Sequence, residues 1–478
     1  MIYNSVIIGA GPAGLAYANY AKKHNPNEKI IILEKDKTIG GCHKVNRKKY
    51  ENNNYFCEHG PRAYFNNYVN FISLLKSMKL DFKDLFVKRY SMIEFIYKSV
   101  MKDNFFGFSE FLKITRDFIL ILFDNTHGIN LSVYDYMISN NFNNKSIINI
   151  DFLCRTLDGG DSSRISLNSF LNSTIQMFLY SIYTPRKPND EGLFLYWRRF
   201  LEQKKVKFQL NADVKEIISK DDKIEAIILN NGNKIVGDKF IFAIPPANFL
   251  SINGLKEAFN LKDDYIQKTE YSEYISISFH WDFKLDLEEH IKISNIKTEW
   301  YLITANMSSD FMNFKEPKSK TVISCAIVLT DVKGRYTNKT ANECNEEELI
   351  KEVYEQLRLI YKNIPKPTIY FINNYYNNDL RKWEGNETAY LKVPKYDYID
   401  FKSKKYKNLY CLGTHNGKHK NSFTSLESAI SNSIKLSNII FNKKDKIKRC
   451  FDLRDLIIVI MSIILLLLII KYTYAIYK

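Results

Sequence analysis

Three glycines near the N-terminus are the first residues whose type and spacing indicate chemistry. Gly9, Gly11 and Gly14 stand at the G-x-G-x-x-G spacing, directly after the apolar run 6–8. In this pattern the first glycine permits a tight turn, the second lets the backbone approach a pyrophosphate, and the third lets the next helix pack on a sheet. The free N–H groups and positive end of that helix then face a diphosphate. The spacing predicts a dinucleotide-binding turn.

An acidic residue follows at the distance that such a turn requires. Glu34 ends a second apolar run, KIIIL, twenty residues after Gly14. A carboxylate at this strand end can accept hydrogen bonds from both hydroxyls of an adenosine ribose. Pro12 suits the first turn of the intervening helix, where its missing N–H has no partner to lose. Strand, helix, strand and acid in register weigh against a chance glycine triplet in a surface loop.

A glycine pair, Gly40-Gly41, comes a few residues after the acid. It suits a second close approach of the backbone to the cofactor. A nicotinamide dehydrogenase does not need this feature, whereas FAD is longer and lies extended through its domain. We therefore expect FAD, and not NAD, on the glycine turn.

Several motifs together resemble one family. GAGPAG, LEK and IGG, followed by EHGPR at residues 58–62, resemble the N-terminus of the flavin amine oxidase superfamily, and the GPR triplet is most similar to its protoporphyrinogen oxidase branch. Residues 408–440 look like its C-terminal signature, in which a glycine ends a strand and the next helix points its N–H groups at the flavin pyrimidine. The resemblance implies an FAD-dependent oxidoreductase that moves hydride from an apolar, amine or porphyrinogen-type substrate to flavin N5, with reoxidation by oxygen.

The resemblance also implies which residues bind the cofactor. Val214, which we expect in a loop before the hairpin, corresponds to a valine whose backbone meets the adenine. Ser428 and Thr414 depart from the usual glycine and acid of the C-terminal signature. Because the flavin performs the chemistry, no catalytic side chain is singled out. The implied cofactor-binding residues are Gly9, Gly11, Pro12, Ala13, Gly14, Glu34, Lys35, Gly41, Cys42, Arg62, Val214, Gly413, Thr414, Glu427 and Ala429.

The seven cysteines are scattered and form no C-x-x-C pair. This pattern indicates a reducing compartment, without a disulfide framework or a zinc site. Cys42-His43 and Cys57-x-His59 fit no common metal-ligand spacing, so no metal is expected. Cys411 stands near the position of a covalent flavin link in some relatives, but it falls inside a predicted strand, which favours a buried structural cysteine.

The positioning elements predict an α/β fold: a Rossmann-like FAD-binding domain interrupted by an α+β substrate domain, plus a C-terminal transmembrane helix. The FAD-binding domain is assigned to 1–67, 201–250 and 399–445, and the substrate domain to 68–200 and 251–398. A hairpin is expected to turn at Asn231-Gly232. Within 251–398, antiparallel strands alternate with a helix over 346–361.

Residues 68–200 show largely helical spacing and concentrate aromatic side chains. These aromatics fit two interpretations, the lining of an apolar substrate cavity or ordinary core at helical spacing. The residues concerned are Phe105, Phe106, Phe108, Phe118, Phe123, Phe178, Tyr180 and Tyr183.

The C-terminus carries the membrane signal. Residues 456–470 contain only Ser462 as a polar residue, and 455–477 are long enough to cross a bilayer, although a buried core helix passes the same composition test. The basic stretch 443–449 precedes this run, which predicts a single-pass C-terminal anchor with a cytoplasmic catalytic domain. The net charge of +16 comes without a nucleic-acid-binding motif, so a small-molecule substrate and a membrane are the expected partners.

Two other functions share these sequence features. A non-redox flavin mutase of the sugar-nucleotide type has the same N-terminal architecture, and a membrane-tethered flavoprotein without robust catalysis would retain the same motifs. The substrate, the electron acceptor and the oligomeric state do not follow from the sequence.

Overall fold

The computed structural model describes most of the chain. The residues that it leaves undescribed are 1, 98–104, 159, 263, 266–269, 272–273, 288–290, 295–297, 308–318, 386–388, 391–397, 418–424 and 477–478.

The N-terminal strand lies in the middle of a seven-stranded sheet. Strand β1 (Ile2–Ile8) pairs in parallel with β2 (Ile30–Leu33) on one side and β11 (Lys234–Phe242) on the other. Beyond them, β8 (Lys207–Gln209) and β21 (Leu409–Cys411) extend the parallel part. The antiparallel strands β10 (Lys223–Leu229) and β9 (Val214–Lys220) complete the sheet. Stretches far apart in sequence thus assemble one sheet, and the hairpin at Asn231-Gly232 is confirmed.

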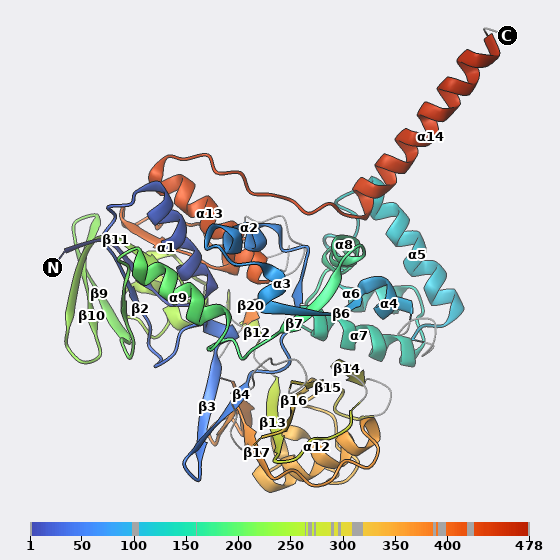
Figure 1. The fold of residues 1–478 in the computed structure, drawn as a ribbon, viewed down its shortest axis with the longest axis horizontal. Helices are drawn as coiled ribbons and strands as arrows, with labels where there is room; N and C mark the ends of the chain where they lie inside the picture. Colours follow the sequence, from blue (N-terminus) through green and yellow to red (C-terminus); the bar gives the residue numbers. More distant parts are fainter. Residues whose placement is uncertain are drawn as a thin grey trace.

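Helices cover one face of this sheet (Figure 1). Helix α1 (Pro12–His24) packs beside α13 (Leu426–Phe441), and α2 (Val69–Ser77) and α9 (Leu193–Gln203) contribute buried residues to the same core. On the other face, α10 (Leu255–Ala258) and the 3-10 turn Pro246–Phe249 pack against β9 to β11. Both faces of the central strand are therefore buried, which explains its uninterrupted apolar run.

A second sheet forms the lower part of the molecule in Figure 1. Its strand order is β14-β15-β16-β13-β17, and all of its pairs are antiparallel. Helix α12 (Glu346–Ile360) agrees with the predicted helix over 346–361, and it covers one face of this sheet. The strands span Ile275–Trp281 (β13), Ile291–Ser294 (β14), Leu302–Asn306 (β15), Thr321–Ile327 (β16) and Ile369–Ile372 (β17).

Shorter strands connect these two parts. The hairpin of β3 (Val45–Tyr50) and β4 (Asn53–Glu58) packs on the second sheet, while β18 (Tyr375–Asn377) with β19 (Lys382–Glu384) and β12 (Glu270–Tyr271) with β20 (Ala389–Tyr390) form further pairs. The helical expectation for the end of 167–183 is wrong, because Ser181–Pro185 is strand β7, between β5 (Tyr64–Phe65) and β6 (Phe86–Ser91). Pairing with β6, about ninety residues away along the chain, overrides local periodicity there.

The helices α4 (Met92–Ile96), α5 (Phe108–Phe123), α6 (Val133–Ser139), α7 (Asn144–Asp158) and α8 (Leu167–Met177) form a separate layer, and α3 (Phe82–Leu85) joins α2 to β6. The aromatic residues here do not share one role. Phe105 and Tyr183 are buried, as ordinary core predicts, but Phe108 and Phe123 on α5 are strongly exposed.

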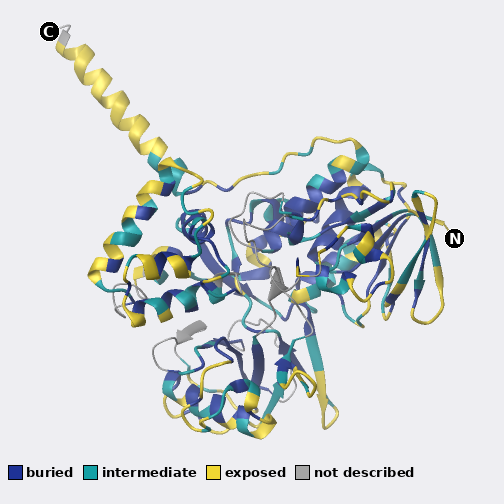
Figure 2. Cartoon of the chain, turned by 180° about the vertical axis from the view of Figure 1, so that it is seen from behind, coloured by how far each residue is buried: buried dark blue, intermediate teal, exposed yellow. Residues whose placement is uncertain are grey.

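The C-terminal helix α14 (Leu453–Ile476) projects away from the rest of the chain; its first residues are half-buried, and it is exposed from Ile458 to Ala475 (Figure 2). Within residues 453–475, an 18-residue window has a mean hydropathy of 2.9, and the segment is long and apolar enough to cross a membrane. The buried-core alternative for this stretch is wrong, because no residue of that window is buried.

Candidate FAD-binding site

The glycine turn lies between the carboxyl end of β1 and the start of α1. Gly9 has a left-handed backbone (φ +103°), and a Cβ there would lie 2.4 Å from the carbonyl oxygen of Ala243. At Gly14 a Cβ would lie 2.2 Å from the carbonyl oxygen of Gly9. Both positions therefore require glycine for the fold itself.

Gly11 differs from its two neighbours in the motif. Its backbone is extended (φ −76°, ψ 176°), and a Cβ there would meet nothing closer than the Gly41 Cα, at 3.6 Å. The N–H of Gly40 donates to the carbonyl of Ala10 at 3.0 Å, so the glycine pair lies directly on the turn. Two bare backbone segments that are thirty residues apart in sequence thus meet at one place. Space for a ligand explains Gly11 better than the fold does.

The amino end of α1 is prepared for an anion. Gly11 is its N-cap residue, Pro12 opens it, and no acidic residue lies in its first turn. Within the described part of the chain no side chain caps these N–H groups. An uncapped helix end carries positive partial charge and free donors, which fits the pyrophosphate of FAD.

Glu34 lies immediately after β2, with its carboxylate turned back toward the glycine turn. Oε2 accepts a hydrogen bond from the Ala10 N–H at 2.8 Å, and Oε1 accepts one from the Asp36 N–H at 3.1 Å. Burial raises the pKa of this carboxyl despite both hydrogen bonds. Each oxygen keeps a second lone pair, so the group is positioned to accept further hydrogen bonds from ribose hydroxyls.

Arg62, from the EHGPR motif, also lies beside the glycine pair. Its guanidinium donates to the carbonyl of Cys42, the residue after the glycine pair, and its Nε is buried with no partner among the described residues. Next to this contact, the His43 ring approaches the Tyr64 hydroxyl at 3.2 Å. Burial, with the nearby Arg62 charge second, lowers the pKa of His43 to about 3, so this imidazole is neutral.

Glu58, from the same motif, is a residue that the sequence reasoning missed. Its side chain is fully buried at the end of β4, and neither carboxylate oxygen has a hydrogen-bond partner among the described residues. Burial raises its pKa to about 7, although the positive charge of Arg62 opposes this. The only available signal was its place in EHGPR, because burial of an acid cannot be seen from spacing.

The C-terminal signature approaches α1 from the other side. Helix α13 begins at Leu426 with Ser425 as its N-cap, and the Ser433 hydroxyl donates to the Ala13 carbonyl at 2.9 Å. The Glu427 carboxylate accepts from the N–H groups of Asn70 and Phe71, both at 2.8 Å. Its side chain therefore holds α2 in place, and burial raises its pKa to about 7.

The remaining expected residues lie at varying depth. Ala429 is buried in the α1–α13 core, and Gly413 receives the Asn432 side-chain amide at its carbonyl, 2.7 Å away, with Thr414 following in a 3-10 turn. Val214 begins strand β9 and does not sit in a loop, so that detail of the prediction is wrong. Lys35 and Cys42 are exposed.

Cys411 lies fully buried in β21, as the structural interpretation expects, and burial raises the pKa of its thiol to about 12. Among the described residues no group of three or more His, Cys, Asp or Glu side chains could hold a metal ion.

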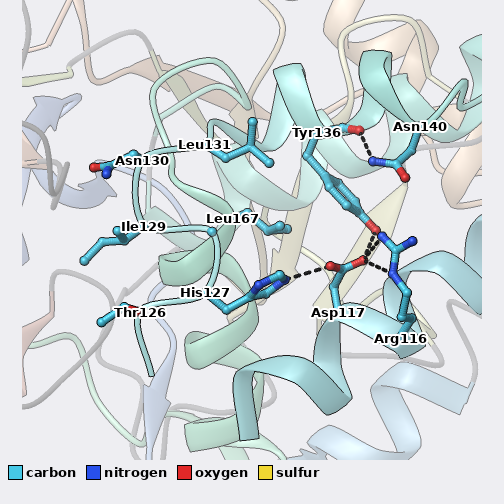
Figure 3. Close-up of a pocket in the computed structure, with 11 residues that line it drawn as sticks. Arg116, Asp117, Thr126, His127, Ile129, Asn130, Leu131, Tyr136, Asn140 and Leu167 are labelled. Carbon is cyan, nitrogen blue, oxygen red and sulfur yellow. Dashed lines mark hydrogen bonds and ion pairs between the residues drawn. The ribbon is translucent and has the colours of Figure 1, made fainter. Parts of the chain in front are cut away.

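A cavity of about 480 Å³ lies outside this region, among α5, α6 and the start of α8 (Figure 3). Its polar centre is Asp117, which accepts from Arg116, His127 and Tyr136, each at 2.7 Å. Although burial opposes ionisation, these hydrogen bonds together lower the pKa of the Asp117 carboxyl below its usual value. All four groups are thus engaged with one another, which is typical of a structural cluster.

A family model described as flavin-containing amine oxidoreductase matches residues 12–431. No curated protein sequence matches the chain significantly. Three solved structures share its fold at low identity. Wild-type putrescine oxidase bound to putrescine is 11% identical, with a TM-score of 0.64, over 93% of this chain and 100% of that one.

The second is an oxidoreductase from Methanosarcina mazei, 14% identical with a TM-score of 0.60, over 92% of this chain and 100% of that one. The third is a protein from Exiguobacterium sp. 255-15, provisionally assigned as a protoporphyrinogen oxidase. It is 13% identical with a TM-score of 0.59, over 92% of this chain and 99% of that one. At such identities the likeness establishes the fold alone.

Proposed function

Since this chain belongs to the flavin-containing amine oxidoreductase family and is an FAD-dependent oxidoreductase, we propose that it oxidises an apolar, amine or porphyrinogen-type substrate at a membrane surface. The observation that carries the cofactor site is the contact between Gly11 and Gly41, at the uncapped end of α1. We assign the FAD-binding unit as Rossmann-like, with the domain bounds predicted from the sequence.

The residues of this chain bind and orient the cofactor. The first N–H groups of α1 receive the pyrophosphate, and the Glu34 carboxylate receives the adenosine ribose. The Ser433–Ala13 hydrogen bond joins the middle of α13 to the first turn of α1, which supports placing the two helices side by side with the N–H groups of α13 toward the flavin. The bound flavin supplies the acceptor for hydride, and oxygen is the proposed final oxidant.

Arg62 has a different assignment. Its guanidinium, fixed on the Cys42 carbonyl, has donors left over for a flavin phosphate or for a carboxylate of the substrate. This placement supports the resemblance to the protoporphyrinogen oxidase branch, which rests on the GPR triplet at residues 60–62.

The test is anaerobic mixing of the purified full chain with candidate amines and with a porphyrinogen. We expect denaturation to release FAD, and one substrate class to bleach the bound flavin without added reductant. Admission of oxygen should then restore its colour. Absence of flavin would contradict the cofactor site, whereas product formed only after prior flavin reduction would favour a mutase.

The C-terminal helix is assigned as a single-pass anchor with the catalytic part on the cytoplasmic side. Its support is the exposed apolar length of α14 and the basic residues 443–449 that precede it. An anchor of this kind places the flavin site where an apolar substrate is concentrated.

A further inference from the structure

Helix α5 differs from an ordinary surface helix because it is apolar on its outward side as well as on its inward side, where Ile121 is buried and Ile114 and Phe118 pack on the core. Its inward side carries two acids, Glu110 and Asp117, which are only 6% and 3% exposed. Its outward side carries large apolar residues, of which Phe108 is 79% and Phe123 is 87% exposed. On a water-facing helix of a globular protein, the outward side carries polar and charged residues.

The exposed apolar residues line one side of the helix, which we call the outward face of α5, with Thr115 and Arg116 as polar residues among them. Their spacing of three, four and seven residues places them on one side of the helix. Exposed apolar residues scattered singly are normal, but a group of this size on one side of a helix marks an interaction surface. The outward face consists of Phe108, Phe111, Leu112, Ile119, Leu120 and Phe123, each at least 40% exposed.

Both inward acids have hydrogen-bond partners, so these contacts fix which side of α5 faces the core. Glu110 accepts from the side-chain amide of Asn143 at 2.6 Å, and Asp117 accepts from Tyr136 and His127, both at 2.7 Å. Turning the helix over would break these hydrogen bonds and leave buried polar groups without partners. Within the outward face, the Thr115 hydroxyl donates to the Phe111 carbonyl at 2.8 Å, so this polar group is also satisfied.

The helix lies where α14 leaves the protein. Leu453, the first residue of α14, packs on the same core as Ile121 of α5, and the Arg454 guanidinium donates to the Ile121 carbonyl at 3.3 Å. In Figure 1, α5 runs along the outer edge of the molecule from the base of α14. A bilayer crossed by α14 must therefore begin beside the carboxyl-terminal half of α5.

We propose that the outward face of α5 is a second membrane-contact surface, which lies in the headgroup and upper acyl region of the bilayer that α14 spans. An amphipathic helix of this kind buries its apolar face to a depth of about 5–10 Å. Arg116 lies within this face, four residues after Leu112 and three before Ile119, and we place its exposed guanidinium, which is paired with Asp117, at headgroup level. This contact holds the layer of helices α5–α8 against the lipid, so the protein is attached to the membrane at two places and not by α14 alone. This inference depends on the anchor assigned above.

The experiment uses the full chain reconstituted in phosphatidylcholine vesicles. Single cysteines are introduced as Leu112→Cys and Phe123→Cys and labelled with a polarity-sensitive fluorophore. Lys351→Cys on the exposed side of α12 is the aqueous control, and Leu465→Cys within α14 is the membrane control. Labelling of the exposed Cys42 is subtracted with the unsubstituted protein, and flavin absorbance confirms folding.

We expect lipids that carry a shallow quencher to reduce emission at 112 and 123 by about half or more, lipids that carry a deep quencher to reduce emission at 465, and both to leave 351 unchanged. The proposal is overturned if 465 is quenched while iodide in water reaches 112 and 123 as readily as 351. It is equally overturned if both iodide and lipid quenchers fail at 112 and 123, because protein, such as a second copy, then covers the face. Lack of quenching at 465 would refute the anchor as well, while the flavin content reports separately on the cofactor site.

Discussion

At the scale of single residues, Glu34 is the side chain on which cofactor binding depends most directly. Glu34→Ala removes charge-assisted hydrogen bonds to ribose worth about 1.5–3 kcal/mol each, so the Kd for FAD should rise by at least about tenfold. Titration of apoprotein with FAD measures this. Lys37→Ala, an exposed neighbour, is the matched control. An unchanged Kd would remove Glu34 from the site.

Arg62 lies close to the assigned flavin region. The effect of its forked guanidinium can be tested separately from the effect of its positive charge. Arg62→Ala should reduce FAD retention or slow the turnover of carboxylated substrates, because a fixed forked donor is lost. Arg62→Lys keeps the charge without the fork and should recover only part of the effect. Normal flavin content and normal kinetics in the alanine variant would leave Arg62 as a structural residue.

The buried carboxyl of Glu58 leads to a prediction about how the free energy of unfolding depends on pH. Burial raises its pKa from 4.5 to about 7 in the folded protein. The folded state then holds more protons than the unfolded state between these values, so the free energy of unfolding falls as the pH rises through this window. Glu58→Gln removes this loss and should be more stable than the unsubstituted protein at pH 8, by an amount on the order of 3 kcal/mol.

Denaturant unfolding of the apoprotein between pH 4.5 and 8 measures the effect of Glu58→Gln. Glu225→Gln, at an exposed position in β10, should leave the pH dependence unchanged. If the Glu58→Gln protein loses stability in parallel with the unsubstituted protein, Glu58 has a partner that satisfies its charge.

At the scale of elements, two glycines of the turn allow its role in folding to be tested separately from its role in FAD binding. Gly14→Ala places a Cβ 2.2 Å from the Gly9 carbonyl oxygen and should destabilise the β1–α1 unit by several kcal/mol. Gly11→Ala meets ordinary contact at 3.6 Å and should fold with nearly unchanged stability. It should nevertheless bind FAD much more weakly, because its methyl group occupies the space of the pyrophosphate.

Thermal unfolding of the two apoproteins, followed by FAD titration of the Gly11→Ala variant, tests this contrast. Each variant is the control of the other. Tight FAD binding by Gly11→Ala would show that the pyrophosphate does not pass over this residue.

At the scale of the whole molecule, truncation tests the anchor. Leu453 and Arg454 contact the α5–α8 layer, so the deletion should begin after Leu456 and retain these contacts. The protein lacking 457–478 should leave the membrane fraction in a high-salt wash without detergent, whereas the full chain should stay, and the truncated protein should keep its FAD. Sedimentation and flavin absorbance measure both properties.

Loss of FAD together with unfolding would show that the apolar run stabilises the fold. Retention in the membrane fraction after a salt wash would instead assign the main attachment to another surface, for which the outward face of α5 is the candidate.

The sequence by itself determined the features that depend on neighbours along the chain. The glycine turn, the α1 helix, the acid at position 34 and the apolar length of α14 are each contained in one short stretch. Local backbone geometry and side-chain periodicity are enough to specify them. For the same reason the hairpin turn at Asn231-Gly232 and the start of α12 at Glu346 were predicted where the structure has them.

Only the tertiary structure decided which distant groups meet. The contact of Gly11 with Gly41, the burial of Glu58 and the pairing of Ser181–Pro185 with β6 all depend on partners far away in sequence. The direction of α5 is the clearest case. Its periodicity predicts a helix, but which side faces outward is settled by hydrogen bonds to Asn143, His127 and Tyr136, and no local pattern contains those partners.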